Sequence, residues 1–421
     1  MNILVIGSGG REHAIVRKLK ESPKTGRLWC APGNGGIAAD AECVDIGAMD
    51  IDGVVRFAQE NPVDLVFVAP DDPLAAGMVD ALEAAGTRAF GPRANAAVIE
   101  GSKVFSKNLM KKYGIPTARY EVFSDPAEAV AYIEAEGKFP VVVKADGLAL
   151  GKGVIIAESL EAAKDAVRTI MEDKVFGASG NHIVVEEFLT GPEVSVLAFT
   201  DGKTLRPMVS SKDHKRALDG DRGLNTGGMG TISPNPYYTD EIAQTCMETI
   251  FLPTIRAMQA EGRPFKGCLY FGLMLTPDGP KVIEYNARFG DPETQVVLPR
   301  LKTDFVDILD AVIDERLDAL EIEWSADACA CVVMASGGYP QSYPKGIEIT
   351  GLDENGQVAG ATVYHAGTKR AGDKLVTNGG RVLGVTAAAE TLDAALEKAY
   401  AAVEKIHFDG AHYRRDIGRT K

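Results

Sequence analysis

The chain has 421 residues, with 45 Lys and Arg against 59 Asp and Glu, and a formal net charge of −14. Its 45% hydrophobic and 25% charged residues exclude a disordered or fibrous chain, and its length predicts about three domains. The acidic balance argues against a broad nucleic-acid or membrane surface. The six cysteines form no C-x-x-C pair and no apolar run is long enough for a membrane span, so we expect a cytoplasmic protein without disulfides or zinc.

The first hundred residues alternate predicted strands with predicted helices. Apolar runs predict strands at residues 3–6, 28–31 and 64–69, and helical segments are expected at 13–20 and 74–85. Strands alternating with helices at this spacing are typical of a doubly wound parallel sheet.

A second unit begins near residue 104 and mixes both element types. Helices are predicted at 104–113 and 126–136, and strands at 141–145, 154–157 and 183–187. A glycine-rich turn separates the first two of these strands.

Farther along the chain, the pattern changes to hairpins. Asp-Gly dipeptides at 201–202 and 278–279 predict tight turns between apolar runs. The polar, glycine-rich stretch 210–236 is predicted to be a long irregular segment, and such segments are usually functional loops or disordered. A last unit follows Trp324, with strands near 330–334 and 381–386 and apolar residues at helical spacing from Leu392 to Ile406.

Glycines follow the first predicted strand at Gly7, Gly9 and Gly10. Glycine there lets the backbone approach a phosphate, and a helix N-terminus supplies free N–H groups and a partial positive charge. A dinucleotide motif would need glycine at Glu12 and an acidic residue after the second strand, which instead ends in residues 31–33. The loop therefore favours a phosphate-bearing small molecule over NAD, with a tight turn that binds nothing as the alternative.

Lys144 ends an apolar strand and is followed by Gly147, Gly151 and Gly153. The spacing fails the P-loop pattern, because one residue too few separates the glycines and a β-branched run follows. We expect a glycine hairpin over phosphates, with Lys144 reaching them from the strand. The alternative is a solvated hairpin, although an exposed lysine is unexpected at the end of so apolar a strand.

Two glutamates near the next strand, Glu186 and Glu193, are candidate partners for a nucleotide. Carboxylates accept hydrogen bonds from an adenine amino group or from ribose hydroxyls. On their own they are equally typical of a solvated surface.

The strand that contains Glu284 and Asn286 is the most informative stretch. Side chains two apart on a strand share a face, so these two oxygen ligands suit a hard divalent ion such as Mg²⁺. Arg288 lies two residues farther on and can reach a substrate carboxylate or a developing negative charge. The alternative, an edge strand with a polar face, weakens because the chain also carries the lysine strand and its glycine hairpin.

These stretches, in this order, resemble the glycinamide ribonucleotide synthetase family of the ATP-grasp superfamily over nearly the whole chain. The matching segments are residues 5–13, 31–34, 101–103, 144–147, 151–153, 213–216, 225–230, 286–295, 365–369 and 377–382. Two departures are visible: residues 69–72 read Ala-Pro-Asp-Asp where the family usually has Gly-Pro-Glu, and Leu224 replaces a proline.

The resemblance implies that ATP, glycine and 5-phosphoribosylamine give ADP, phosphate and glycinamide ribonucleotide through glycyl phosphate, in de novo purine biosynthesis. It also implies ATP as co-substrate, Mg²⁺ or Mn²⁺ as cofactor, small-molecule substrates rather than nucleic acid or membrane, and a monomer. Gly272 stands where other ATP-grasp enzymes carry a second metal carboxylate, so few protein ligands to the metal are expected.

The resemblance also assigns residues. Catalytic roles fall on Lys144, Arg288 and Asp213, and the metal ligands are Glu284 and Asn286. ATP contacts are expected from Lys103, Lys144, Gly147, Gly151, Gly153, Glu186, Glu187, Phe188, Leu189 and Glu193. The other substrates are expected at Gly9, Gly10, Arg11, Glu12, Gly33, Asn34, Lys215 and Asn225.

The expected fold class is α/β, with an N-terminal doubly wound parallel-sheet domain, an ATP-grasp core of two α+β lobes and a small C-terminal β-rich domain. The expected boundaries are 1–102, 103–192 for the small lobe, 193–325 for the large lobe, and 326–421.

Three alternatives stay open from the sequence: another ATP-grasp ligase with a different acid or amine, a nucleotide sensor without catalysis, and a dehydrogenase. The metal strand argues against a sensor, and Glu12 argues against a dehydrogenase.

Overall fold

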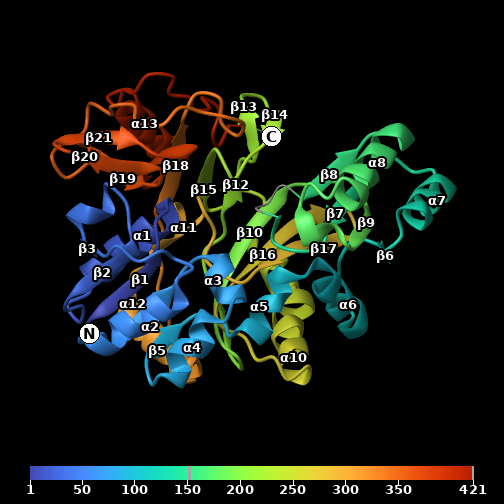
Figure 1. Cartoon of the computed structure of the whole chain (residues 1–421), viewed down its shortest axis with the longest axis horizontal. Helices are drawn as coiled ribbons and strands as arrows, with labels where there is room; N and C mark the ends of the chain where they lie inside the picture. The colour runs from blue at the N-terminus through green and yellow to red at the C-terminus, as the bar shows by residue number, and fades with distance from the viewer. Residues whose placement is uncertain (150–152, 420–421) are drawn as a thin grey trace.

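The structure, a computed structural model, describes residues 1–149 and 153–419, and four sheets of four or five strands organise that part of the chain. Figure 1 shows the N-terminal body in blue beside the C-terminal body in red, while the lobe that carries α7 and α8 projects to the opposite side. The predicted α/β class is confirmed.

The N-terminal body is a parallel sheet with strand order β3-β2-β1-β4-β5, as the alternation predicts. The residues of β1 are all buried, as expected for a sheet covered on both faces. The predicted helix 74–85 is two helices, because Gly77 adopts φ +89° and breaks it. The elements are β1 (Ile3–Gly7), α1 (Gly10–Glu21), β2 (Leu28–Pro32), β3 (Glu42–Cys43), α2 (Ile51–Glu60), β4 (Leu65–Val68), α3 (Asp71–Ala75), α4 (Met78–Ala84), β5 (Arg88–Phe90) and α5 (Ala94–Gly101).

The small lobe is an antiparallel sheet of order β6-β9-β7-β8 with its own core of Val, Ile and Ala side chains. Helix α6 begins where Ser102 Oγ accepts the N–H of Phe105 (3.0 Å) and ends at Gly114, whose φ of +68° is typical of a C-terminal cap. The elements are α6 (Lys103–Tyr113), β6 (Tyr120–Phe123), α7 (Pro126–Glu136), β7 (Val141–Ala145), β8 (Val154–Ala157), α8 (Leu160–Val167) and β9 (Ile183–Glu187).

The large lobe is built on a sheet of order β11-β10-β16-β17, and both predicted Asp-Gly turns connect its strands. Gly272 pairs with Glu284 and Leu273 with Val282, so Ile283 is an extra residue that forms a bulge in β17. The elements are β10 (Glu193–Asp201), β11 (Leu205–Pro207), α9 (Asp240–Cys246), α10 (Leu252–Ala260), β16 (Lys266–Thr276), β17 (Gly279–Asn286), α11 (Thr294–Val297) and α12 (Phe305–Ile313).

The C-terminal body contains an antiparallel sheet of order β12-β15-β18-β22-β19. The prediction of an irregular segment at 210–236 is wrong in part. Four short strands form there, and β15 pairs with β18, where Ile232 is buried in the C-terminal core. The elements are β12 (Lys212–Asp213), β13 (Arg216–Leu218), β14 (Arg222–Asn225), β15 (Gly230–Ser233), β18 (Ala328–Ala335), β19 (Thr362–His365), β20 (Thr368–Ala371), β21 (Lys374–Thr377), β22 (Arg381–Ala389) and α13 (Leu392–Val403).

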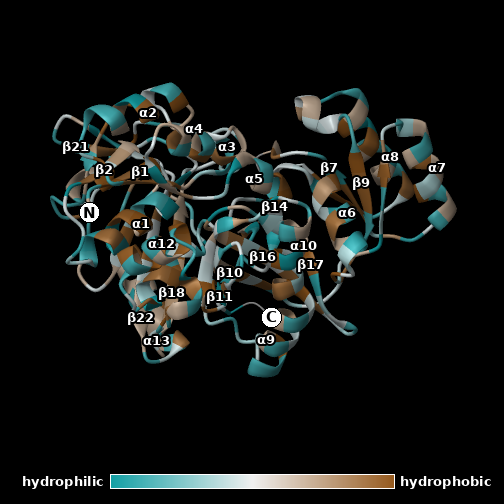
Figure 2. Ribbon diagram, turned by 90° about the horizontal axis from the view of Figure 1, so that it is seen from below, coloured by the Kyte–Doolittle hydropathy of each residue, from teal (hydrophilic) through white to brown (hydrophobic). Residues whose placement is uncertain are grey.

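Two of the hydrophobic cores connect different bodies. One core contains residues of β1, β4, β16 and β17, and another joins β1 to α12 and β18. Figure 2 shows brown, hydrophobic stretches on labelled strands such as β1 and β18 and on helix α12. The large lobe is therefore packed against both terminal bodies, while the small lobe has a separate core. Among the described residues, no helix has the length and apolarity needed to cross a bilayer.

Candidate active site

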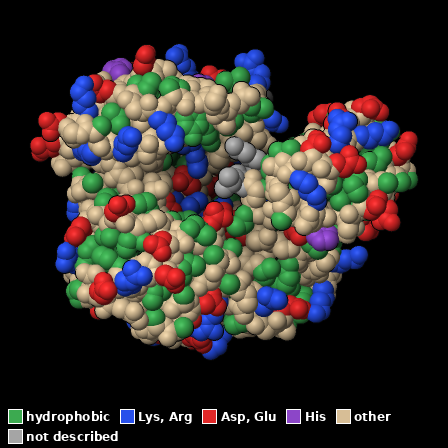
Figure 3. All heavy atoms as spheres, viewed as in Figure 1, with side chains coloured by type: hydrophobic (Ala, Val, Ile, Leu, Met, Phe, Trp, Pro, Cys, Tyr) green, Lys and Arg blue, Asp and Glu red, His purple; other side chains and the backbone are tan. Residues whose placement is uncertain are grey.

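A cavity of about 890 Å³ lies between the two lobes and extends to both terminal bodies. Figure 3 shows this cleft beside the projecting lobe, with acidic and basic side chains in its depth. Most of the predicted site residues line it: Arg11, Lys103, Lys144, Gly147, Gly153, Glu186, Glu187, Phe188, Leu189, Glu193, Asp213, Lys215, Asn225, Glu284, Asn286 and Arg288. Five predicted substrate residues are not in its lining, namely Gly9, Gly10, Glu12, Gly33 and Asn34. Gly151 lies outside the described residues.

A buried carboxylate holds two lysines at the small-lobe end of the cleft. Glu186 Oε1 lies 3.0 Å from Lys144 Nζ and 3.1 Å from Lys107 Nζ, and all three side chains are buried. Lys144 also donates to the carbonyl of Ile283 in the β17 bulge (3.2 Å), which links the small lobe to the large lobe. Glu186 therefore fixes both ammonium groups, in addition to its predicted place beside the nucleotide.

Lys107 is a site residue that the sequence reasoning missed. Burial lowers the pKa of its ammonium group to about 8, although Glu186 acts to raise it. Lys107 also donates to Thr117 Oγ1 (2.7 Å). It follows Lys103 by four residues on α6, and residues four apart share a helix face, so the spacing itself was an available signal.

The helix that carries these lysines is attached to the start of the glycine hairpin. Lys103 Nζ donates to the Gly147 carbonyl (2.7 Å), and Asp146 Oδ1 accepts from Ser102 Oγ (3.1 Å) and from the Val104 N–H (3.2 Å). The first turn of α6 and the end of β7 are thus held together, which places Lys103 and Lys144 in one cavity.

Apolar side chains line the cavity near the mouth of the small lobe: Val142, Val154, Ile156, Phe188, Leu189 and Met274. Phe188 is 39% exposed and Ile156 is 38% exposed, which is unusual for side chains of this size. An apolar slot next to charged groups is typical of a pocket for a planar base that carries phosphates.

Glu284 and Asn286 line the same cavity from β17, while Tyr285 between them is buried and its hydroxyl is within 2.8 Å of Thr254 Oγ1. The predicted alternation therefore holds for these three residues, whereas Ile283, in the bulge, also contributes to the cavity lining. Burial alone would raise the pKa of Glu284, but Lys215, Lys144 and Lys103 together lower it, so the group is a carboxylate at neutral pH. Gly272 lies opposite Glu284 and leaves no second side chain there.

Glu100, a second residue that the sequence reasoning missed, supports this strand from α5. Its Oε2 accepts the Ala287 N–H (2.7 Å) and its Oε1 lies 3.2 Å from Arg288 Nη2. With the Asn286 amide nitrogen donating to Glu100 Oε1 (3.0 Å) and to the Tyr285 carbonyl (3.2 Å), Asn286 Oδ1 stays available as an acceptor. A carboxylate and an amide oxygen fit a divalent cation that takes few protein ligands.

Acidic residues of β12 and of the segment that follows β17 meet at the far end of the cavity. Burial and the neighbouring Glu293 raise the pKa of Asp213 well above its usual range. Tyr270 donates to Glu293 Oε1 (3.0 Å), and Arg381 of β22 donates to the carbonyls of Gly227 and Asp291 (both 2.9 Å). The C-terminal body therefore contributes Arg381, which no sequence motif had singled out as a site residue.

The glycine loop is held by the side chains around it. Glu12 Oε2 accepts the Gly9 N–H (2.7 Å) and Glu12 Oε1 accepts from Arg11 Nη1 (3.2 Å), so Glu12 closes the start of α1. The Arg11 N–H donates to Asp291 Oδ2 (3.1 Å). Arg11, next to this loop, is the residue that reaches the cavity. Asp71 also lines it, from the segment 69–72 whose sequence differs from that usual in the family.

The two α/β lobes, the lysines between them and the acidic strand define an ATP-grasp enzyme. Three family models match the chain: phosphoribosylglycinamide synthetase N domain at residues 1–100, its ATP-grasp (A) domain at 101–294, and its C domain at 329–420. The chain belongs to the phosphoribosylglycinamide synthetase family, and it is an ATP-dependent ligase of purine biosynthesis.

Curated relatives agree along the full length. The chain is 52% identical to phosphoribosylamine–glycine ligase of Halalkalibacterium halodurans, covering 99% of this chain and 96% of that one. It is 47% identical to the Clostridium acetobutylicum protein of the same name, with both chains fully covered. A crystal structure of phosphoribosylamine–glycine ligase from Thermotoga maritima is 35% identical, with a TM-score of 0.88 over 99% of this chain and 100% of that one.

The fold extends to more distant proteins. The biotin carboxylase domain of Hydrogenobacter thermophilus 2-oxoglutarate carboxylase, solved with MgADP and bicarbonate, has a TM-score of 0.73 over 98% of this chain and 91% of that one. At 16% identity this likeness shows the fold alone.

Proposed function

We propose that the cleft joins glycine to 5-phosphoribosylamine at the expense of ATP, forming glycinamide ribonucleotide. The observation that supports this best is the convergence of the buried Lys107–Glu186–Lys144 group and the Glu284–Asn286 pair on one cavity. Cationic groups beside an oxygen-ligand pair suit ATP phosphates and a divalent cation.

For the nucleotide, we assign the apolar slot with Phe188 and Leu189 to adenine, and Glu193 to the ribose. Lys103, Lys107 and Lys144 face the phosphates, together with Gly147 and Gly153 of the hairpin. Glu186 and Glu187 support this end: Glu187 accepts the Arg119 N–H (2.9 Å), while Glu186 holds two of the lysines. Glu284 and Asn286 would hold Mg²⁺ or Mn²⁺, which neutralises phosphate charge during transfer.

In the first step, a glycine carboxylate oxygen bonds to the γ-phosphorus of ATP as the bond to ADP breaks, giving glycyl phosphate. Arg288 and Lys215 line the cavity beside Glu284 and supply positive charge for the glycine carboxylate and the transferring phosphoryl group. Preorganised charge of this kind lowers the barrier to phosphoryl transfer without covalent help.

In the second step, the amine of phosphoribosylamine attacks the glycyl carbonyl, phosphate leaves, and the nitrogen loses a proton. Asp213 lies at this end of the cavity, and its raised pKa suits a group that takes up a proton. Arg11, Gly9, Gly10, Glu12, Gly33, Asn34 and Asn225 belong to the end where we place phosphoribosylamine.

We also propose the four units 1–102, 103–192, 193–325 and 326–421, because each corresponds to a separate sheet apart from the β12 and β15 strands that join the last one. A monomer is sufficient for activity, since one chain supplies all the residues named above. The six cysteines are unpaired, which suits a reducing cytoplasm.

The test is ADP release measured with each substrate omitted in turn. We expect ADP release beyond a single turnover only when glycine and phosphoribosylamine are both present. Glu284→Ala, whose fold is checked by circular dichroism, should lose most of this release. Equal release with a different acid or amine would contradict the proposed substrates, and near-normal turnover of Glu284→Ala at low Mg²⁺ would contradict the metal assignment.

A further inference from the structure

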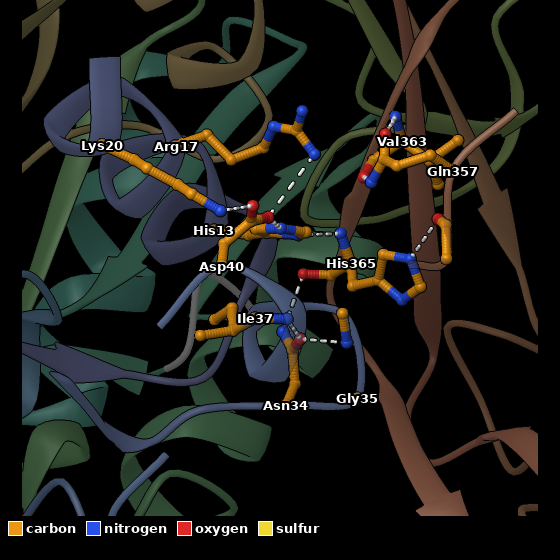
Figure 4. A network of polar contacts seen from close by, with 12 residues as sticks. His13, Arg17, Lys20, Asn34, Gly35, Ile37, Asp40, Gln357, Val363 and His365 are labelled. Atoms are coloured by element: carbon orange, nitrogen blue, oxygen red, sulfur yellow. Dashed lines mark hydrogen bonds and ion pairs between the residues drawn. The ribbon is translucent and has the colours of Figure 1, made fainter. Parts of the chain in front are cut away.

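His13 is a fully buried histidine on α1, one turn after the glycine loop of residues 7–10. Its Nδ1 accepts the backbone N–H of His365 from β19 (2.7 Å), so its proton is on Nε2, which donates to Asp40 Oδ2 (2.9 Å). Lys20 (3.0 Å) and Arg17 (3.4 Å) also contact Asp40, as Figure 4 shows. The ring is thereby held in one tautomer and one orientation.

Asn34 contacts the same residue of the C-terminal body. Its Nδ2 donates to the His365 carbonyl (2.8 Å) and to the Ser8 carbonyl (2.9 Å), and its Oδ1 accepts the N–H groups of Gly36 (3.0 Å) and Ile37 (2.9 Å). These four bonds use the full donor and acceptor capacity of an amide. The Asn34 side chain therefore holds the loop and has no group left for a ligand.

Two of the bonds described above join the N-terminal body to His365. His13 Nδ1 accepts the His365 N–H, and Asn34 Nδ2 donates to the His365 carbonyl; together we call them the His365 contact. Gly36 packs against the same residue so closely that a Cβ there would lie 2.1 Å from His365 Cγ. The His365 ring is fixed in turn, since its Nε2 donates to the Gly356 carbonyl (2.8 Å). The contact is a close-packed junction in which both partners are rigid.

The His365 contact fixes the Asn34 side chain, which in turn holds one peptide of the glycine loop. Asn34 Nδ2 donates to the Ser8 carbonyl, and the Gly9 carbonyl accepts the His13 backbone N–H (3.0 Å) in the first turn of α1. The C=O and N–H of a trans peptide point in opposite directions, so each bond fixes the direction of the next N–H. The Gly10 N–H is thereby directed outward from the start of α1, beside the N–H groups of Gly9 and Arg11, which donate to Glu12 and Asp291.

We infer that His13 and Asn34 are positioning residues for phosphoribosylamine: through the His365 contact they hold the glycine loop in the conformation that receives its phosphoribosyl group. This inference rests on the proposed function. It adds a role for the C-terminal body, whose β19 fixes the loop while its β22 brings Arg381 to the cavity.

Two substitutions of His13 separate positioning from simple packing. Asn places its Oδ1 near the former Nδ1 and keeps the acceptor for His365, whereas Gln reaches toward Asp40 and loses that acceptor. Gln fills more of the buried volume, so packing alone would make Asn the worse replacement. Asn34→Asp is a matched second variant, because it keeps the volume and sets a carboxylate oxygen against the two carbonyls.

The control is Gln357→Leu, which removes the two hydrogen bonds between Gln357 and Val363 (both 2.9 Å) and so disturbs β19 without touching the N-terminal body. The measurement is calorimetric binding of glycinamide ribonucleotide to the full chain, with ATP binding recorded on the same samples. We expect His13→Gln and Asn34→Asp to weaken glycinamide ribonucleotide binding about tenfold while ATP binding is unchanged. His13→Asn and Gln357→Leu should bind both ligands as the unmodified chain does.

Unchanged product affinity in His13→Gln, or an equal loss in His13→Asn, would overturn the positioning role. A loss in Gln357→Leu as large as that in Asn34→Asp would overturn it too, because the effect would then reflect the stability of β19. If the unmodified chain itself fails to bind glycinamide ribonucleotide, the proposed function falls first and the positioning role falls with it.

Discussion

The backbone N–H of Arg11 donates to the carboxylate of Asp291, a residue 280 positions away in the sequence. The same carboxylate accepts from Gln295 Nε2 (2.9 Å) and lies 3.5 Å from Arg381 Nη1. Asp291 follows β17, Arg11 lies in the first turn of α1, and Arg381 opens β22. One largely buried side chain therefore joins the N-terminal body, the large lobe and the C-terminal body at the end of the cleft where we place phosphoribosylamine.

Replacing Asp291 by alanine should lower the free energy of unfolding by about 2 kcal/mol, because it removes the carboxylate beside the part-buried Arg381 and leaves two N–H groups without their acceptor. Urea unfolding followed by circular dichroism measures the change. Asp291→Asn keeps one acceptor oxygen, so its free energy of unfolding should fall by less. If Asp291→Ala is as stable as the unmodified chain, the three-way junction contributes nothing to the fold.

Lys107 should give the activity an ionisation in the alkaline range. Its pKa is about 8, so its positive charge beside Glu186 and Lys144 is lost above that pH. The value of kcat/KM for ATP reports groups of the free enzyme and should fall above pH about 8. Lys107→Arg stays charged and should remove that decline. In Lys107→Met, kcat/KM for ATP should be about tenfold lower than in the unmodified chain at neutral pH. An unchanged decline in both variants would contradict the assignment. Lys111→Met, at an exposed position of the same helix, is the matched control.

Removal of the Glu100 carboxylate should weaken cation binding on β17. Glu100→Ala frees the Asn286 amide and leaves Arg288 without its partner, and changes in such supporting contacts typically cost about ten-fold to 100-fold in metal affinity. Mn²⁺ binding in the presence of ADP, followed by electron paramagnetic resonance, measures this directly. Glu100→Gln keeps an acceptor for the Ala287 N–H, so its Mn²⁺ affinity should lie between that of Glu100→Ala and that of the unmodified chain. Equal Mn²⁺ affinity in all three proteins would show that Glu100 does not support the strand.

His214 should make the fold sensitive to acid. Burial lowers its pKa from 6.5 to about 4, and its Nε2 accepts the Gly418 N–H (3.0 Å), which a protonated ring could not do. Between these two pH values the unfolded chain binds the extra proton, so stability rises with pH across this window and falls as the pH drops through it. The slope attributable to one histidine is at most about 1.4 kcal/mol per pH unit.

Urea unfolding between pH 7 and pH 4 tests this. His214→Asn keeps a donor for the Gly230 carbonyl. It should remove the contribution of one proton from the slope of the free energy of unfolding against pH. His182→Asn, at an exposed position in the small lobe, should leave the slope as it is. An unchanged slope in His214→Asn would contradict the assignment.

Local pattern predicted much of the fold and of the cleft. The alternation on β17 placed Glu284 and Asn286 on one face, and an exposed lysine was unexpected in the apolar strand that contains Lys144, which the structure buries. Both inferences depend only on the period of a strand and on the apolar character of its residues.

The residues that sequence pattern missed depend on contacts between distant segments. Glu100 supports β17 from another body, and Arg381 reaches the cavity from β22; neither contact has a local signal. Asn34 and Glu12 were expected to touch substrate, yet their side chains hold the glycine loop instead of lining the cavity. The segment 210–236 looked irregular because its strands are very short, and because its last strand, β15, also pairs with β18 from a distant part of the chain.

The most direct measurement for the central claim is a crystal structure of the protein grown with ADP and Mn²⁺, with anomalous scattering used to locate the cation. We predict a peak about 2.1–2.2 Å from oxygens of both Glu284 and Asn286, with the nucleotide phosphates beside Lys144 and adenine against Phe188. A cation bound away from β17, or a nucleotide bound outside the cleft between the two lobes, would contradict the account.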